Sequence, residues 1–211
     1  MEDSGGWSDS IAASPTSTVV NGSMQNIMEL GIDQMLGERM RPQDLTMQLI
    51  ANDKSVTLMG GNISTDIHGS KFRSEYDALP ADLKKLQIKI VSFGLDHDVN
   101  QQITLNENKE DVPVKVLNQN IYINRVYESN GDLFVTVTSE ENVILSRVYA
   151  IMDNRKVSLL ETVDEKLEKK FDGTILRTRT LHFKGTGKKL VLDIQRMSYT
   201  TNCNKTIDIP V

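Results

Sequence analysis

Cysteine is almost absent from this chain of 211 residues, because Cys203 is the only one. A single thiol forms no disulfide within the chain, and it cannot supply the cysteine pairs of common structural zinc sites. Only three histidines are present, so metal sites rich in histidine are also disfavoured. We therefore expect no cofactor, no metal ion and a reducing intracellular location, in the cytoplasm or the nucleus.

Long apolar runs and catalytic motifs are missing as well. No stretch approaches the roughly 18 apolar residues of a membrane-spanning helix, so no transmembrane segment is expected. The N-terminus is acidic and lacks the apolar core of a secretory signal, which predicts a protein that is not secreted. The patterns G-x-S-x-G, H-E-x-x-H and G-x-G-x-x-G do not occur. These absences predict that the protein is not an enzyme.

One glycine- and lysine-rich stretch, KGTGKK at residues 184–189, invites a catalytic interpretation. A Walker-type phosphate loop needs a glycine five residues before its Gly-Lys pair, and a Ser or Thr directly after that pair. His182 and Lys189 occupy those two positions here. The residues that follow alternate between apolar and polar, as in a strand. We therefore expect residues 184–189 to form a hairpin turn.

The N-terminal part of the chain differs from the rest in composition. Residues 1–22 are rich in Ser, Gly, Thr and Asp, which is typical of a disordered tail. Residues 23–41 have apolar residues at helical spacing, with Ser23 as the expected N-cap. The apolar stripe consists of Ile27, Met28, Ile32, Met35 and Leu36. Because methionine-rich surfaces adapt to partners, this helix is a candidate partner-binding site; packing against its own domain is the alternative.

From residue 42 to residue 211 the apolar pattern has a period of two, which predicts an antiparallel β domain. Three dipeptides between strand-like runs are typical of tight hairpin turns: Asn52-Asp53, Asn130-Gly131 and Asp153-Asn154. The runs between residues 121 and 163 favour a four-stranded meander. The predicted fold is mostly β, an antiparallel sandwich or open barrel with an N-terminal amphipathic helix and a disordered tail.

The C-terminal third carries local positive charge, although the formal net charge of the chain is −5. Basic residues outnumber acidic ones between residues 166 and 196, over two strands expected to form a hairpin. The candidate anion- or nucleic-acid-binding residues there are Lys169, Lys170, Arg177, Arg179, Lys184, Lys188 and Lys189. Such a surface suits the phosphates of nucleic acid or an anionic lipid surface. A solvated hairpin face is the alternative.

Several stretches resemble hairpins of the cytosolic fatty-acid-binding proteins: NGDLFVTVT, two RVY triplets, and KFDGT followed later by GKKLVLDI. They occur here in a different order, and the helical lid of that family is not recognisable. The resemblance therefore implies shared hairpin chemistry and not membership of the family.

Three functional hypotheses follow from these features. The first is a structural, assembly or scaffolding protein that self-associates or binds protein partners, as a viral matrix- or coat-type protein does. The second is a nucleic-acid-binding β-barrel of the OB type that uses residues 166–196. The third is an intracellular carrier of an apolar ligand.

Overall fold

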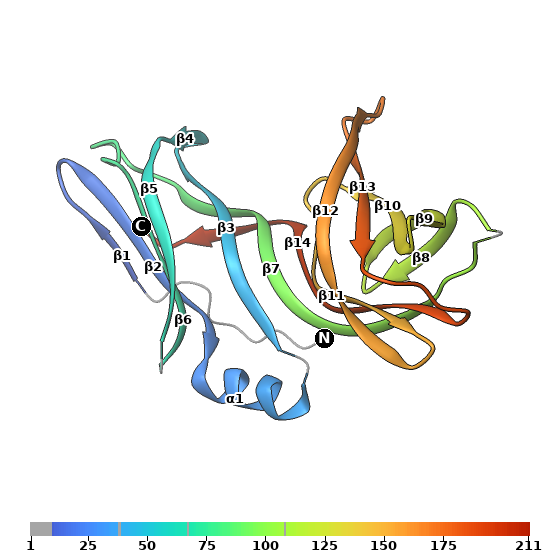
Figure 1. Ribbon diagram of the computed structural model, residues 1–211. Coiled ribbons are helices and arrows are strands. Elements are labelled where there is room, and N and C mark those ends of the chain that lie inside the picture. The colour runs from blue at the N-terminus through green and yellow to red at the C-terminus, as the bar shows by residue number, and fades with distance from the viewer. Residues whose placement is uncertain (1–9, 38, 67, 108) are drawn as a thin grey trace. The chain divides into compact units, whose positions relative to one another are not determined.

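The computed structural model describes residues 10–37, 39–66, 68–107 and 109–211 (Figure 1). The described chain divides into two compact units, each with its own apolar core. Unit 1 contains the residues up to Asp96 together with Thr200–Val211, and unit 2 contains His97–Tyr199. Strands β7 (Leu86–Thr104) and β14 (Leu190–Ile209) contribute residues to both units. The sequence had suggested one β domain over residues 42–211.

Unit 1 contains a four-stranded antiparallel sheet in the order β1-β2-β6-β5. The bounds of its strands are β1 Ser10–Ala13, β2 Ser17–Asn26, β5 Leu58–Asp66 and β6 Gly69–Asp77. Strand β3 (Met40–Ala51) lies between β4 (Lys54–Val56) and β7 in a second sheet. The core of the unit includes Val20, Leu49, Phe72, Tyr76 and Ile90, each at most 5 % exposed.

Residues 10–22, which were expected to belong to a disordered tail, instead form β1 and part of β2. Residues 1–9 of that expected tail lie outside the described residues. Val20 is fully buried, and β2 pairs with β6, which lies far along the chain. The polar composition of these residues predicted disorder and not a strand. A strand can nevertheless form here, because it needs only alternate apolar side chains and a partner for its backbone.

The one helix among the described residues, α1, spans Ile27–Leu36 and is shorter than the expected helical segment 23–41. Ser23 lies in β2, and Asn26 is the N-cap in its place. The Asn26 side chain accepts a hydrogen bond from the backbone N–H of Glu29 at 2.9 Å, and the Glu29 carboxylate accepts one from the N–H of Asn26 at 2.8 Å. Gly37 ends the helix with a left-handed backbone, φ 67°.

Unit 2 is built on strands in the order β14-β11-β12-β13-β10-β9-β8. Their bounds are β8 Val112–Val116, β9 Gln119–Ser129, β10 Asp132–Glu140, β11 Ile144–Met152, β12 Arg155–Lys169 and β13 Ile175–Phe183. The core of the unit includes Ile121, Leu133, Phe183, Leu192 and Ile194, all fully buried. The prediction of a mostly β, antiparallel fold is confirmed, and the sheets of the described residues stay open.

The three tight turns predicted at Asn52-Asp53, Asn130-Gly131 and Asp153-Asn154 are present. Asn130 and Gly131 have φ values of 53° and 81°, and they join β9 to β10. Asp153-Asn154 joins β11 to β12, and Asn52-Asp53 joins β3 to β4, again with positive φ at both residues. Local sequence therefore specified these turns, because few residue types tolerate this backbone conformation.

The longer-range strand pairings differ from the sequence-based expectation. Strand β10 pairs with β13, and β11 pairs with β14, so residues 121–163 form two separate hairpins and no meander. Strands β13 and β14 are not neighbours, so residues 184–189 connect two separated strands and are not a hairpin turn. The real hairpin is β12–β13, closed by residues 170–174. Alternation of side chains identifies a strand but carries no information about its partner.

Within the described part of the chain, no helix has the length and apolar character needed to cross a bilayer.

Candidate interaction surfaces

Strand β12 has a long unpaired edge. It pairs with β11 only through Arg155–Ser158, whereas its pairing with β13 extends from Leu159 to Lys169. Beyond Ser158, the edge opposite β13 faces no strand among the described residues. We call residues 159–169 along this side the free edge of β12. Such an edge presents unpaired backbone N–H and C=O groups that can pair with another strand.

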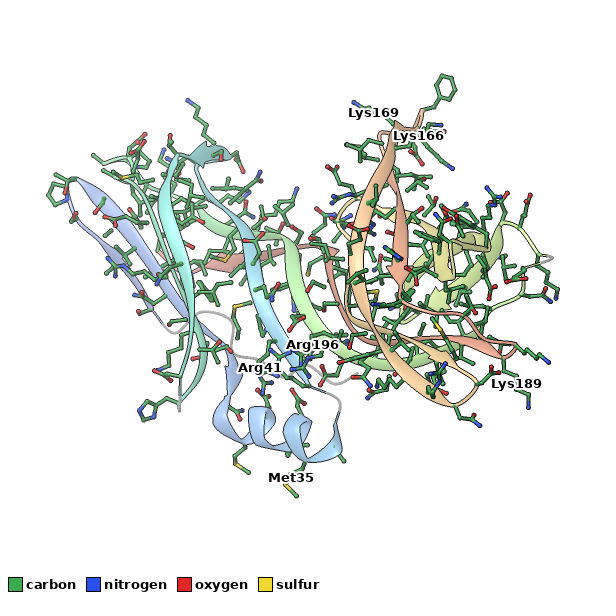
Figure 2. All side chains as sticks on the ribbon, in the orientation of Figure 1. Met35, Arg41, Lys166, Lys169, Lys189 and Arg196 are labelled. Atoms are coloured by element: carbon green, nitrogen blue, oxygen red, sulfur yellow. The ribbon has the colours of Figure 1, made fainter. Side chains whose placement is uncertain are left out.

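Exposed apolar side chains lie along the free edge and at the tip of the β12–β13 hairpin. Leu160, Val163 and Leu167 are 60 %, 50 % and 62 % exposed, and Phe171 at the tip is fully exposed. The tip is closed by a 2.8 Å hydrogen bond from the N–H of Lys170 to the carbonyl of Thr174. In Figure 2, Lys166 and Lys169 lie at this end of the hairpin. A free edge with exposed apolar residues is typical of a protein-binding surface.

The pairing of β12 with β13 is regular in two short stretches, Glu161–Asp164 and Lys166–Lys169. The register shifts between Leu159 and Glu161, and again between Asp164 and Lys166. From Lys166 to Lys169 the pairs run without interruption. On this regular stretch, the ammonium of Lys166 lies 2.7 Å from a carboxylate oxygen of Glu168, and both side chains are exposed. The stretch is therefore extended, and it carries opposite charges two residues apart.

His182 ties three strands together on the face of unit 2 opposite the core. Its Nδ1 lies 2.9 Å from Oε1 of Glu161 on β12, and its Nε2 lies 2.9 Å from Oδ2 of Asp132 on β10. These two contacts raise the pKa of His182, because both carboxylates stabilise the imidazolium; desolvation opposes the shift only in part. The pKa of Asp132 is lowered, first by the backbone N–H of Gly185 and then by His182.

A ladder of rings extends from His182 across the neighbouring strands. The ring of His182 stacks on Phe134 with centroids 4.4 Å apart, and Phe134 stacks on Tyr127 at 5.2 Å. The guanidinium of Arg125 lies 4.5 Å from the centroid of the Tyr127 ring. The ring faces contact one another, so they are not available as a flat surface on which a nucleic-acid base could stack. The stacked rings instead stabilise the register of the strands.

The seven predicted anion-binding residues are not gathered on one surface. Lys169 and Lys170 lie at the tip of the β12–β13 hairpin, whereas Lys184, Lys188 and Lys189 lie in the connection beyond the other end of β13. Figure 2 labels Lys169 and Lys189 at these two places. The nine residues of β13 separate the two groups by roughly 26 Å at the rise of an extended strand.

The two arginines of the predicted site lie partly or wholly inside the protein. Arg179 is 6 % exposed and donates hydrogen bonds from Nη2 to Oγ of Ser139 at 2.7 Å and to the carbonyl of Val143 at 2.9 Å. Arg177 is half-buried, and with Arg179 it lines a pocket of about 250 Å³. Arg179 therefore joins β13 to the loop before β11.

Asp153 fixes the lysine-rich connection between β13 and β14. Its carboxylate accepts hydrogen bonds from the backbone N–H groups of Lys188 at 3.1 Å and Lys189 at 2.9 Å. These two bonds lower the pKa of Asp153. The lysine-rich loop thus uses its backbone to bind a carboxylate of its own chain.

The predicted partner-binding residues of α1 are exposed wherever their side chains are described. The exposed fractions are 74 % for Met28, 52 % for Ile32, 88 % for Met35 and 66 % for Leu36. The side chain of Ile27 lies outside the described residues. Figure 2 shows Met35 pointing away from the helix. Whether this stripe binds a partner stays a prediction.

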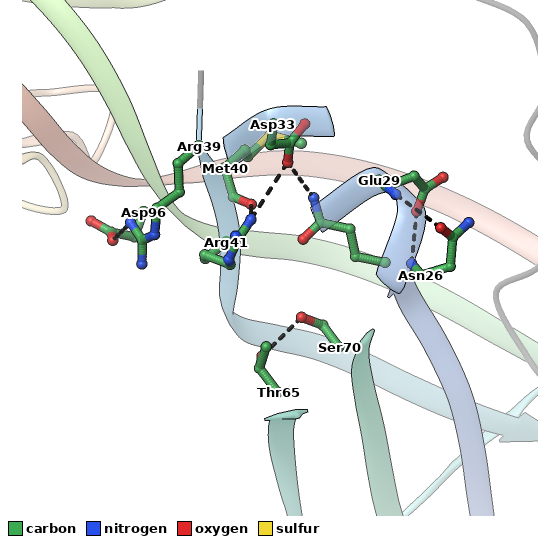
Figure 3. Close-up of polar contacts among 10 residues, drawn as sticks. Asn26, Glu29, Asp33, Arg39, Met40, Arg41, Thr65, Ser70 and Asp96 are labelled. Carbon is green, nitrogen blue, oxygen red and sulfur yellow. Dashed lines mark hydrogen bonds and ion pairs between the residues drawn. The ribbon is translucent and has the colours of Figure 1, made fainter. Parts of the chain in front are cut away.

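Polar contacts hold α1 in place (Figure 3). Gln25 donates a 2.7 Å hydrogen bond to the carboxylate of Asp33, which also lies 3.5 Å from the guanidinium of Arg41. Arg39, just beyond the helix, forms an ion pair with the buried Asp96. These contacts join both ends of the helix to unit 1 and leave its methionines free of the core.

The described residues offer little support for a metal or catalytic centre. No group of three or more His, Cys, Asp or Glu side chains in the described ranges has the geometry of a metal site. A pocket of about 770 Å³ in unit 2 is lined by Asn106, Glu107, Glu128, Asp153 and Lys188, among others. The lining of this pocket combines three carboxylates with Thr186 and Lys188.

The sequence did not reveal the free edge of β12. Residues 164–171, DEKLEKKF, have a composition that favours a short helix, because Glu, Lys and Leu are good helix formers. Pairing with β13 overrides that preference over residues 164–169. Leu167 and Phe171 are four residues apart, a spacing that fits one face of a helical turn. The local sequence therefore does not distinguish such a turn from an exposed edge strand.

The comparisons with known proteins assign no family. No family model matches the chain, and no curated protein matches it. A solved structure described as the conserved domain protein from Bacillus anthracis is similar, with 8 % sequence identity and a TM-score of 0.25 over 96 % of this chain and 86 % of that chain. At this TM-score the similarity carries no argument about fold or function.

Proposed function

We propose that this protein is a non-enzymatic assembly protein that acts by self-association. The observation that carries the proposal is the free edge of β12, where an extended backbone edge and exposed apolar side chains coincide. Edge strands are usually shortened, covered or made uniformly polar, because an exposed apolar edge promotes association. An edge of this kind is consistent with pairing to another chain.

The exposed apolar stripe of α1 gives secondary support to an assembly role. Met28 and Met35 are more than 70 % exposed on a capped and well-anchored helix. An amphipathic helix normally turns such residues toward its own core. The two surfaces lie in different units, so a single copy has more than one element that suits protein partners.

The two other hypotheses have less support from the geometry. A nucleic-acid site on one hairpin needs its cations together, whereas the lysines occupy the two ends of β13 and Arg179 is buried. A carrier needs an apolar cavity, whereas the pocket of about 770 Å³ is lined largely by charged and polar residues.

The test is the native mass of the purified protein across a range of concentrations, by light scattering after size exclusion. We expect a mass that rises above the monomer value of 23.7 kDa as concentration increases. Adding a single-stranded oligonucleotide should leave that mass unchanged. A strict monomer at every concentration, at both low and high salt, would refute the proposal.

A further inference from the structure

We propose that two copies of this chain pair through the free edges of β12, antiparallel and centred on Leu167. The inference rests on the proposed self-association and names its partner and register. It places Leu167 of one copy opposite Leu167 of the other. The regular stretch Lys166–Lys169 provides the backbone geometry for the pairing.

Symmetry limits the registers to be compared. In an antiparallel pair, residues that lie opposite one another point to the same face of the sheet. A two-fold symmetric pair of identical strands must therefore place one residue opposite its own copy. Within Lys166–Lys169, centring on Lys166, Glu168 or Lys169 would set a charge against the same charge. Leu167 is the one uncharged centre in that stretch, and the other regular stretch, Glu161–Asp164, contains no cation that could face its carboxylates.

Charge complementarity supports the Leu167 centre on both sides. This register sets Lys166 of each copy opposite Glu168 of the other. Opposite charges and apolar pairs at facing positions stabilise a sheet, and like charges weaken it. Moving the centre by one residue in either direction destroys this agreement.

The same residues explain why association would be selective. Lysines on an edge strand and irregularities in its register discourage indiscriminate pairing. Here Lys166 and Glu168 carry opposite charges on either side of Leu167, so the edge favours a strand with the complementary order of charges. The second copy has that order. The interface is short, so the dimer should be weak and dependent on concentration and salt.

Disulfide trapping tests the register directly. In a Cys203→Ser background, Leu167→Cys places a thiol next to its symmetry mate, at a Cα separation that a disulfide can span. Leu160→Cys is the matched control, because Leu160 is as exposed as Leu167 but lies far along β12 from the two-fold centre. We expect oxidation to cross-link the Leu167→Cys protein at least tenfold faster. Equal rates for the two variants, or faster cross-linking of Leu160→Cys, would overturn the register.

A charge exchange provides a second test that does not depend on thiols. Lys166→Glu or Glu168→Lys alone sets like charges opposite one another, and each should weaken dimerisation about tenfold. The double exchange restores both pairs and should recover the affinity of the unchanged chain. Double-variant affinity no better than that of the single variants would contradict the inference.

The outcomes separate the inference from the proposed function. A wild-type protein that is monomeric at all concentrations refutes both. A wild-type protein that associates without preferential cross-linking at position 167 refutes only the pairing through β12. In that case the Met28→Gln/Met35→Gln variant of α1 shows whether the helix is the surface that associates.

Discussion

The charge of His182 matters to unit 2, because this side chain connects β10, β12 and β13 through two carboxylates. Its side chain is 13 % exposed and stacks on Phe134. The pKa of this histidine is higher in the folded protein than in the unfolded chain. Its stabilising effect is therefore fully present below the unfolded pKa of about 6.5 and is lost as the pH rises through the folded pKa.

The variant His182→Gln should accordingly lose stability mainly at low pH. We expect the loss in the free energy of unfolding to be larger at pH 5.5 than at pH 8.5 by about 1 kcal/mol, the net scale of one intramolecular hydrogen bond. Urea denaturation at the two pH values measures the difference. His68→Gln, at an exposed histidine of unit 1, is the control and should show no such dependence. An equal loss at both pH values for His182→Gln would show that only its packing matters.

At the scale of secondary structure, the tight turns follow from residues next to one another in the sequence, whereas strand pairing depends on residues far apart in the chain. Asn130 and Gly131 specified their hairpin locally, because both positions need positive φ. The segment from Asp164 to Lys169 favoured a helix by composition, yet its pairing with β13 made it a strand. The local preference for a helix amounts to a few tenths of a kcal/mol of free energy per residue. The free energy gained by pairing with a distant strand exceeds this preference.

Helix α1 offers a clear test of whether its methionines belong to a core or to a surface. The double variant Met28→Gln/Met35→Gln should change the free energy of unfolding by less than about 0.5 kcal/mol, because both side chains are largely exposed. Met47→Gln, at a methionine only 6 % exposed in the same unit, is the matched control and should cost roughly 2–5 kcal/mol. Urea denaturation gives both numbers. A large loss in the helix variant would mean that the stripe packs on its own unit.

At the scale of the whole molecule, the chain has two apolar cores that share no residue. One core draws on strands near the N-terminus, and the other is formed between Ile103 and Met197. The basic residues that looked like one site in the sequence are distributed over both ends of β13. Charge that is local in the sequence is therefore not local on the surface.

The two cores should respond separately to substitution. Leu49→Ala in unit 1 and Leu133→Ala in unit 2 each remove a fully buried side chain and should cost about 3 kcal/mol. Hydrogen exchange should show each loss among the slow amides of its own unit. Because the two leucines have no packing partner in common, their effects should add to within about 0.5 kcal/mol in the double variant. Exchange rates that rise equally in both units after either substitution would contradict this.

The sequence by itself determined the fold class and the tight turns. Alternating side chains predict strands, and Asn, Asp and Gly at positive φ predict the turns, because both signals act over a few residues. Tertiary structure alone decided which strands are neighbours, that Val20 lies in a core, that Arg179 is buried and that β12 has a free edge. The physical reason is that a strand bonds to its partner through backbone groups that every residue possesses, so pairing is decided by the packing of the whole chain.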